Sequence, residues 1–149
     1  MAAPPETVRA VVEALGRIRA AWREGRPRDM AELLDEDVAM AFPDFAGRLE
    51  GRDALIASFE DFQKAARVVE YREGDVQVDG AEDAAVAQVP FEMVYEREGR
   101  RWRSTGWDVW VFARRGNRWR AIWRTLQGLA EQPADARSKE KEEATTEVR

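Results

Sequence analysis

The sequence contains neither cysteine nor histidine. Without cysteine the chain can form no disulfide, no thiolate metal site and no cysteine nucleophile. Without histidine it lacks the usual general base and the commonest metal ligand, which excludes serine–histidine–aspartate triads and histidine-based zinc or iron sites. The acidic cluster at residues 35–37 is typical of a solvated junction, so we expect no metal site and no cofactor.

Long apolar runs are also missing. The opening MAAPPETVRA has no basic stretch followed by an apolar one, so it does not predict a signal peptide. No segment is long and apolar enough for a membrane span, and we expect a cytoplasmic protein without a membrane partner. The net charge of −5 argues against a general nucleic-acid binder. The tryptophans and arginines near the C-terminus alternate, which separates stacking groups from charges, so we expect no nucleic-acid partner.

The chain does contain enough apolar material for one core. Of its 149 residues 44% are hydrophobic, and six are tryptophan, which is the composition of a globular domain. After Leu129 the segment AEQPADARSKEKEEATTEVR has almost nothing apolar to bury. We therefore expect a single domain over residues 1–129 and a charged, poorly packed tail over residues 130–149.

The first half of the chain has a helical period. Apolar residues recur every three or four positions after PPE and predict a first helix that ends at Gly25 and Pro27. The buried stripe of this helix is expected to consist of Val8, Val11, Val12, Leu15, Ile18 and Trp22. A short second helix is predicted over residues 28–37, a strand over 38–43, a loop over 44–51 and a third helix over 52–66, with Phe59 and Phe62 facing inward.

From Val68 onward the period changes to two, which predicts four successive strands over residues 68–80, 83–98, 101–115 and 117–127. Connections centred on Gly80, Gly99 and Gly116 favour sequential antiparallel hairpins. Helices followed by strands indicate an α+β domain, in which the helices cover one face of a strongly bent, mainly antiparallel sheet.

The alternation within each strand predicts which side chains face the helices. In the last strand Trp119, Ala121, Trp123 and Thr125 are expected to point inward, while Arg118, Arg120, Ile122 and Arg124 point to solvent. In the strand over 83–98 the inward set is Val89, Phe91, Met93 and Tyr95. Outward Glu92 and Glu96 are expected to pair with Arg101 and Arg103 across the next hairpin.

The stretch GWDVWVF places one carboxylate, Asp108, in a strand that is apolar on both sides. Alternation alone does not decide whether Asp108 faces solvent or a pocket. A strand that is apolar on both sides needs cover on both sides. We therefore expect a homodimer through the outer sheet face, with Trp107, Val109 and Val111 in the interface.

The order of elements, the run LLDEDVAM leading into F-P-(x)n-G-R-x-x-L, and the closing DVWVFARRGNRW together resemble the NTF2-like superfamily, and within it the SnoaL-like branch. The resemblance covers roughly Glu6 to Leu126. It implies a cone-shaped half-barrel with a cystatin-like arrangement of three helices on the concave face and one pocket beneath them. Because this superfamily contains isomerases, cyclases, dehydratases and non-enzymes, the resemblance does not identify an activity.

Ketosteroid isomerase is the best-understood relative in this frame. An ungapped overlay puts Asp108 where that enzyme has its protonated, hydrogen-bond-donating aspartic acid, which implies an inward Asp108. Ile18 stands at the position of the oxyanion-hole tyrosine, and Phe42 at that of the catalytic base. Two of the three functional groups are therefore missing, and steroid isomerisation is not predicted.

The candidate catalytic residue is Asp108. With donors nearby it would be an ionised general base, and without them a neutral hydrogen-bond donor. Asp44 is a second candidate at the pocket mouth, although a turn role is favoured. The candidate ligand-binding residues are Trp22, Phe42, Phe91, Met93, Tyr95, Trp110 and Trp123. For each of these, a role in the core is the alternative, and for Trp102 and Trp119 core or rim is favoured.

Two hypotheses for the function follow. In the first, the domain binds a small apolar or aromatic metabolite, and Asp108 carries out acid–base chemistry of the isomerase, cyclase, dehydratase or hydrolase type on it. In the second, it is a non-catalytic dimerisation or accessory domain whose cavity is largely filled by its own side chains. The sequence does not decide between an enzyme and a non-enzyme.

Overall fold

The computed structural model describes residues 2–134 of the chain. In chain order the elements are α1 (Pro5–Arg23), the 3-10 helix η1 (Pro27–Leu33), β1 (Leu34–Ala41), the 3-10 turn η2 (Pro43–Phe45), β2 (Arg48–Glu50), α2 (Arg52–Ala65), β3 (Arg67–Glu73), β4 (Gln77–Ala81), β5 (Ala84–Arg97), β6 (Arg100–Arg115) and β7 (Arg118–Pro133).

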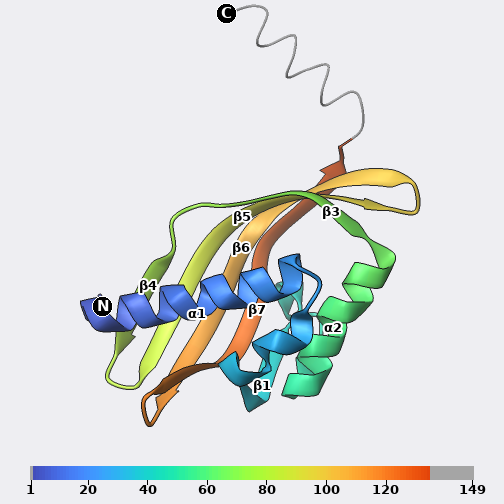
Figure 1. Cartoon of the computed structure of the whole chain (residues 1–149). Helices are drawn as coiled ribbons and strands as arrows, with labels where there is room; N and C mark the ends of the chain where they lie inside the picture. The colour runs from blue at the N-terminus through green and yellow to red at the C-terminus, as the bar shows by residue number, and fades with distance from the viewer. Residues whose placement is uncertain (1, 135–149) are drawn as a thin grey trace, which may run out of the picture.

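The strands form one bent sheet in the order β2-β1-β7-β6-β5-β3, and β4 pairs with β5 beside β3. β1 runs parallel to β7, and the other pairings are antiparallel. Helix α1 crosses the concave face of this sheet, and α2 lies along the side formed by β1 (Figure 1). The predicted α+β class and the mainly antiparallel bent sheet are confirmed.

Helix α1 packs through the stripe that the helical period predicts. Val11, Leu15 and Ile18 are buried against the sheet, whereas Val12 is exposed and does not belong to the stripe. Below the helix the sheet presents small side chains, including Ala85, Ala87 and Ala121, all of them buried. Small side chains at this crossing allow helix and sheet to approach closely, and the buried side chains of both belong to one apolar core.

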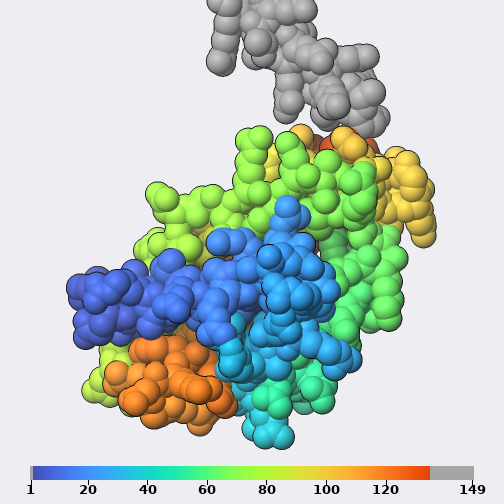
Figure 2. Space-filling view, viewed as in Figure 1, coloured from blue at the N-terminus to red at the C-terminus, as the bar shows by residue number. Residues whose placement is uncertain are grey.

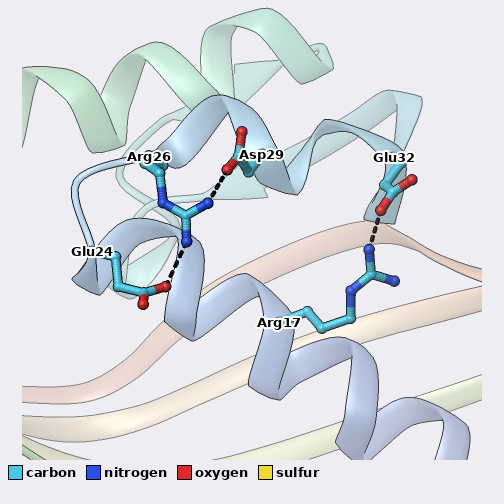
Figure 3. A network of polar contacts seen from close by, with 5 residues as sticks. All are labelled: Arg17, Glu24, Arg26, Asp29 and Glu32. Carbon is cyan, nitrogen blue, oxygen red and sulfur yellow. Dashed lines mark hydrogen bonds and ion pairs between the residues drawn. The ribbon is translucent and has the colours of Figure 1, made fainter.

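The predicted helix over residues 28–37 is wrong in its second half. η1 ends at Leu33, and Leu34 already opens β1, where it lies opposite Ala121 of β7. A helix this short is marginal by itself, whereas pairing with β7 places these residues in a sheet with a packed partner strand. Surface ion pairs fasten η1 to α1: Arg26 lies between Glu24 and Asp29, and Arg17 of α1 meets Glu32 (Figure 3).

The predicted strand over residues 68–80 is two strands, β3 and β4, because of Pro90 in the neighbouring strand β5. Proline has no N–H to donate to the sheet. The break between β3 and β4 lies beside it, where Gly74 N–H donates to the carbonyl of Pro90. Gly80 is not the turn residue but lies inside β4, where an added Cβ would be 2.4 Å from the carbonyl oxygen of Ala84.

The hairpins β5–β6 and β6–β7 turn at Gly99 and Gly116, as predicted, and both glycines have positive φ. The expected outward ion pairs are also present, with Arg103 bonded to Glu92, and Arg101 3.1 Å from Glu96. Within the loop predicted over residues 44–51, residues 48–50 form a short strand, β2, which pairs with β1.

Strand β7 is longer than the pattern predicts. It runs to Pro133 and pairs with Trp102 there, so residues 130–133 belong to the sheet and not to the predicted tail. The remainder of that tail, residues 135–149, lies outside the described residues. From the helical side, α1 and η1 cover much of the sheet, and the β6–β7 hairpin emerges beyond them (Figure 2).

Candidate functional site

A cavity of about 310 Å³ lies on the concave side, between α2 and the long ends of β5, β6 and β7. Most of its wall is apolar. Its aromatic lining residues are Trp22, Phe42, Phe59, Phe62, Tyr71, Phe91 and Tyr95. Met40, Met93, Leu126 and Leu129 complete the apolar surface. The polar groups on the wall are few, and four of them are charged: Arg97, Asp108, Arg124 and Glu131.

Four of these rings, Phe59, Trp22, Tyr71 and Phe91, form one connected set. Trp22 meets Tyr71 edge to face, with ring centroids 5.1 Å apart, and lies 6.4 Å from Phe59. Tyr71 is nearly parallel to Phe91 at 6.5 Å. Phe91 lies opposite Gly106 in β6, and a Cβ at that glycine would be 3.3 Å from its ring. The absence of a side chain at Gly106 thus leaves room for the ring of Phe91.

Asp108 faces the concave side of the sheet, with 9% of its surface exposed. Arg124 binds it through two parallel hydrogen bonds: Nε donates to Oδ1 and Nη2 donates to Oδ2, each at 2.9 Å. The side chain of Asp108 is 13% exposed and that of Arg124 is 11% exposed. This fork geometry pairs a carboxylate with a guanidinium, and it is among the stronger ion-pair arrangements.

The inward position of Arg124 contradicts the simple alternation of the last strand. Val111 and Phe112 are consecutive in β6, but their partners in β7 are Trp123 and Ala121, so Ile122 is an extra residue on β7. Such a bulge reverses which faces the following side chains point to. Arg124 therefore lies opposite inward-facing Trp110, and Trp123 lies opposite Val111 on the outer face.

Two aromatic rings lie close to the guanidinium of Arg124. Its central carbon is 4.7 Å from the ring of Trp110 and 5.0 Å from that of Phe59, distances at which a cation is attracted to an aromatic face. Trp110, a predicted ligand-binding residue, is buried and is not among the residues that line the cavity. It supports Arg124 instead of forming the wall.

The two tyrosines are held protonated. Burial raises the pKa of Tyr71, and the hydrogen bond from its hydroxyl to Glu73, at 2.7 Å, adds to the effect. Burial likewise raises the pKa of Tyr95 to about 12, assisted by its hydrogen bond to Glu131. Each hydroxyl is thus a hydrogen-bond donor already engaged by a carboxylate.

Of the predicted site residues, the structure brings Asp108 together with five predicted wall residues: Trp22, Phe42, Phe91, Met93 and Tyr95. Trp110 and Trp123 lie off the wall. Asp44 has a positive φ of 59° in the η2 turn and is not part of the wall either. Ile18, at the position of the isomerase tyrosine, is a core residue.

Sequence reasoning missed Arg124, which it assigned to solvent. The one available signal was Ile122, an apolar residue in a face otherwise made of arginines, which is where the bulge occurs. Tyr71 also lines the cavity, but for the predicted strand over residues 68–80 no inward side chains were assigned. Long-range contacts bring these residues together, and the local pattern carries little trace of them.

Two further findings concern the described residues. Within residues 2–134 no three carboxylates lie close enough together to hold a metal ion. In the same part of the chain no helix is both long and apolar enough to cross a membrane.

The fold recurs in solved structures of differing description. A candidate scytalone dehydratase from Novosphingobium aromaticivorans has a TM-score of 0.74 at 14% identity, over 87% of this chain and 88% of that one. A hexachlorocyclohexane dehydrochlorinase has a TM-score of 0.77 at 7% identity, over 87% of this chain and 90% of that one. A candidate calmodulin-dependent kinase II association domain from Exiguobacterium sibiricum has a TM-score of 0.69 at 15% identity, over 91% of this chain and 98% of that one.

At these identities the structural similarity establishes the fold alone. No curated protein matches the sequence. The model of one protein family, described as the SnoaL-like domain, matches residues 15–131, which include every residue of the cavity wall. The chain therefore belongs to the SnoaL-like domain family.

Proposed function

We propose that this domain binds a small, mainly apolar, ring-shaped metabolite in the cavity beneath α2. The observation that carries the proposal is the cavity itself: about 310 Å³ of open space, walled by aromatic rings, with one buried ion pair at its side. Ligand pockets start at about 300 Å³ and combine an apolar lining with a few polar groups of this kind. Flat rings suit such a wall because aromatic pairs stack.

The open volume favours this proposal over an accessory domain with a filled cavity. A buried ion pair points the same way, because replacing it by apolar side chains is often neutral or stabilising, so the core does not need it. Two of the solved neighbours are described as a dehydratase and a dehydrochlorinase, which is compatible with small-molecule chemistry in this fold.

Thermal unfolding of the full chain with a panel of one- and two-ring aromatic compounds tests the proposal. A compound at about 100 times its dissociation constant stabilises the folded state by about 2.7 kcal/mol. Met93→Trp, which fills the cavity from its wall, is expected to abolish the shift. Thr105→Trp places the same ring on the exposed outer face of β6 and is the matched control. If no compound raises the unfolding temperature, or if Met93→Trp leaves the shift intact, the proposal fails.

Acid–base chemistry at Asp108 is a second candidate function, favoured by a charged carboxylate on the cavity wall. Both of its oxygens already accept hydrogen bonds from Arg124, so proton transfer would use the lone pairs that remain. The test is incubation of each bound compound in D₂O, followed by mass spectrometry. Deuterium uptake or turnover that Asp108→Asn removes supports catalysis. Unchanged compounds throughout would leave binding as the function.

We further propose that two copies associate through the outer sheet face. An outer apolar patch, defined as Val86, Trp107, Val109, Val111 and Trp123, follows the outward positions of β5, β6 and β7. Trp107 is 46% exposed in the single chain, which is unusual for so large an apolar side chain. A second copy of the same patch would cover it. Light scattering then gives twice the mass of one chain.

A further inference from the structure

The hydrogen bonds of Arg124 leave one edge of its guanidinium unused. Of the five N–H groups of an arginine, one on Nε and one on Nη2 are directed to Asp108. The rings of Phe59 and Trp110 lie 5.0 and 4.7 Å from its central carbon. Nη1 has no acceptor anywhere in residues 2–134.

The unused Nη1 of Arg124 is not sealed inside the protein. Within residues 2–134 only one fully buried side-chain nitrogen or oxygen has no hydrogen-bond partner, and it is Nε of Arg120. Nη1 of Arg124 is therefore not sealed off, and Arg124 is part of the cavity wall. A ligand in the cavity would meet two N–H donors held in a fixed direction by the carboxylate and the two rings.

The charges around the cavity decide what kind of acceptor fits there. Two arginines and two carboxylates line it, so their formal charges cancel. The positive charge of Arg124 is already balanced by Asp108, and Arg97 and Glu131 both flank Tyr95. An anionic ligand would bring an unbalanced charge into a mainly apolar space beside Asp108, which is costly. A neutral acceptor oxygen has no such cost.

We propose that Arg124 is the residue that contacts the ligand, that Asp108 is a positioning residue for it, and that the ligand is a neutral, planar, mainly apolar carbonyl compound such as an aryl ketone. This inference rests on the proposed binding function and deepens it. It moves the central role from the carboxylate to the guanidinium, whose Nη1 edge donates to the carbonyl oxygen of the ligand.

The experiment compares three probes that share one ring system, by calorimetric titration of the full chain. The first is 2-acetonaphthone, a neutral ketone. The second is 2-isopropenylnaphthalene, in which CH₂ replaces the carbonyl oxygen. The third is 2-naphthoate, an anion. The ketone is expected to bind about tenfold more tightly than the alkene, the ratio for one charge-assisted hydrogen bond, and also more tightly than the anion.

The double variant Asp108→Leu/Arg124→Met removes both charges together, so no charge is left buried without a partner. It is expected to bind ketone and alkene with equal affinity. Glu92→Leu/Arg103→Met makes the same exchange at the ion pair on the outer sheet face and is the matched control, expected to keep the tenfold ratio.

The outcomes separate this inference from the binding function. Equal binding of ketone and alkene by the unaltered chain overturns the inference and leaves the binding function standing. A preference for 2-naphthoate overturns the neutral ligand class, and a tenfold ratio that persists in the double variant overturns the role of Arg124. If none of the three probes binds, the inference fails, and the aromatic panel then decides whether the binding function fails with it.

Discussion

The concave face of the sheet is solid at one end and hollow at the other. Where α1 crosses the sheet, Val11, Leu15 and Phe112 are buried in one apolar core. Beneath α2 the same strands β5, β6 and β7 continue, but they enclose the cavity and the ion pair of Asp108 and Arg124. The two ends share strands and period, so the difference comes from the side chains and from which helix lies above them.

The comparison indicates that the packed end beneath α1 serves stability and the cavity beneath α2 serves function. At the solid end small alanines alternate with large apolar residues, which allows close packing. At the hollow end several rings stand along the walls, and a charged pair occupies a position where apolar residues would cost less. Departures of this kind from a well-packed core are expected at functional sites.

The largest expected effect is at the solid end. Phe112→Ala leaves a void in a fully buried cluster, so it should lower the free energy of unfolding by about 3–5 kcal/mol. Phe91→Ala borders open space that already exists, so a loss of only about 1 kcal/mol is expected. Urea denaturation of both variants measures the contrast. Equal losses would mean that the cavity wall is as tightly packed as the core.

The ion pair provides the next largest effect. Asp108→Ala leaves Arg124 without its partner in a nearly buried site, and the expected loss is about 3 kcal/mol. Asp108→Leu/Arg124→Met should recover most of it, because no lone charge remains. Urea denaturation of Asp108→Leu, Arg124→Met and the double variant gives the coupling between the residues. A double variant less stable than Asp108→Ala would show that the pair is needed for folding, which would blur the distinction between the two ends.

The tyrosines on the cavity wall predict a response to pH. Both have a pKa above the ordinary value of 10.0, so between pH 10 and about 12 the unfolded chain loses protons that the folded chain keeps. The unfolded state then binds fewer protons, and the free energy of unfolding falls as the pH rises through this range. These are the only two tyrosines in the chain, so phenolate absorbance follows them directly. Phenolate absorbance from the folded protein near pH 10 would contradict the prediction.

The smallest effect on the stability of the single chain is expected from the outer apolar patch. Trp107→Lys replaces a half-exposed side chain, so the free energy of unfolding of the monomer should change by no more than about 0.5 kcal/mol. The same substitution should halve the mass measured by light scattering, because a lysine on each copy would face the other. Thr105→Lys, one alternation away on the same face, serves as the control. A mass of one chain before any substitution would rule out the dimer.

Local pattern was sufficient for much of the fold. The stripe of α1, the inner face of α2, the hairpins at Gly99 and Gly116 and the inward set of β5 all follow from spacing, because each depends on neighbours in the sequence. The errors occur where pairing with a strand far along the chain decides the type or the bounds of an element. β1 begins inside a predicted helix because β7 offers it hydrogen bonds, and β3 and β4 are separate because Pro90 interrupts their common neighbour.

The sequence by itself determined the class of fold, the apolar wall and, through the resemblance, the inward carboxylate of Asp108. Only the tertiary structure decided that Arg124 is the group that binds this carboxylate and that Trp123 faces outward. The reason is physical. One extra residue at Ile122 of β7 reverses the alternation of the side chains that follow it, as far as a second register shift between Gln127 and Ala130. Whether such a bulge forms depends on the register with β6, which local spacing alone does not determine.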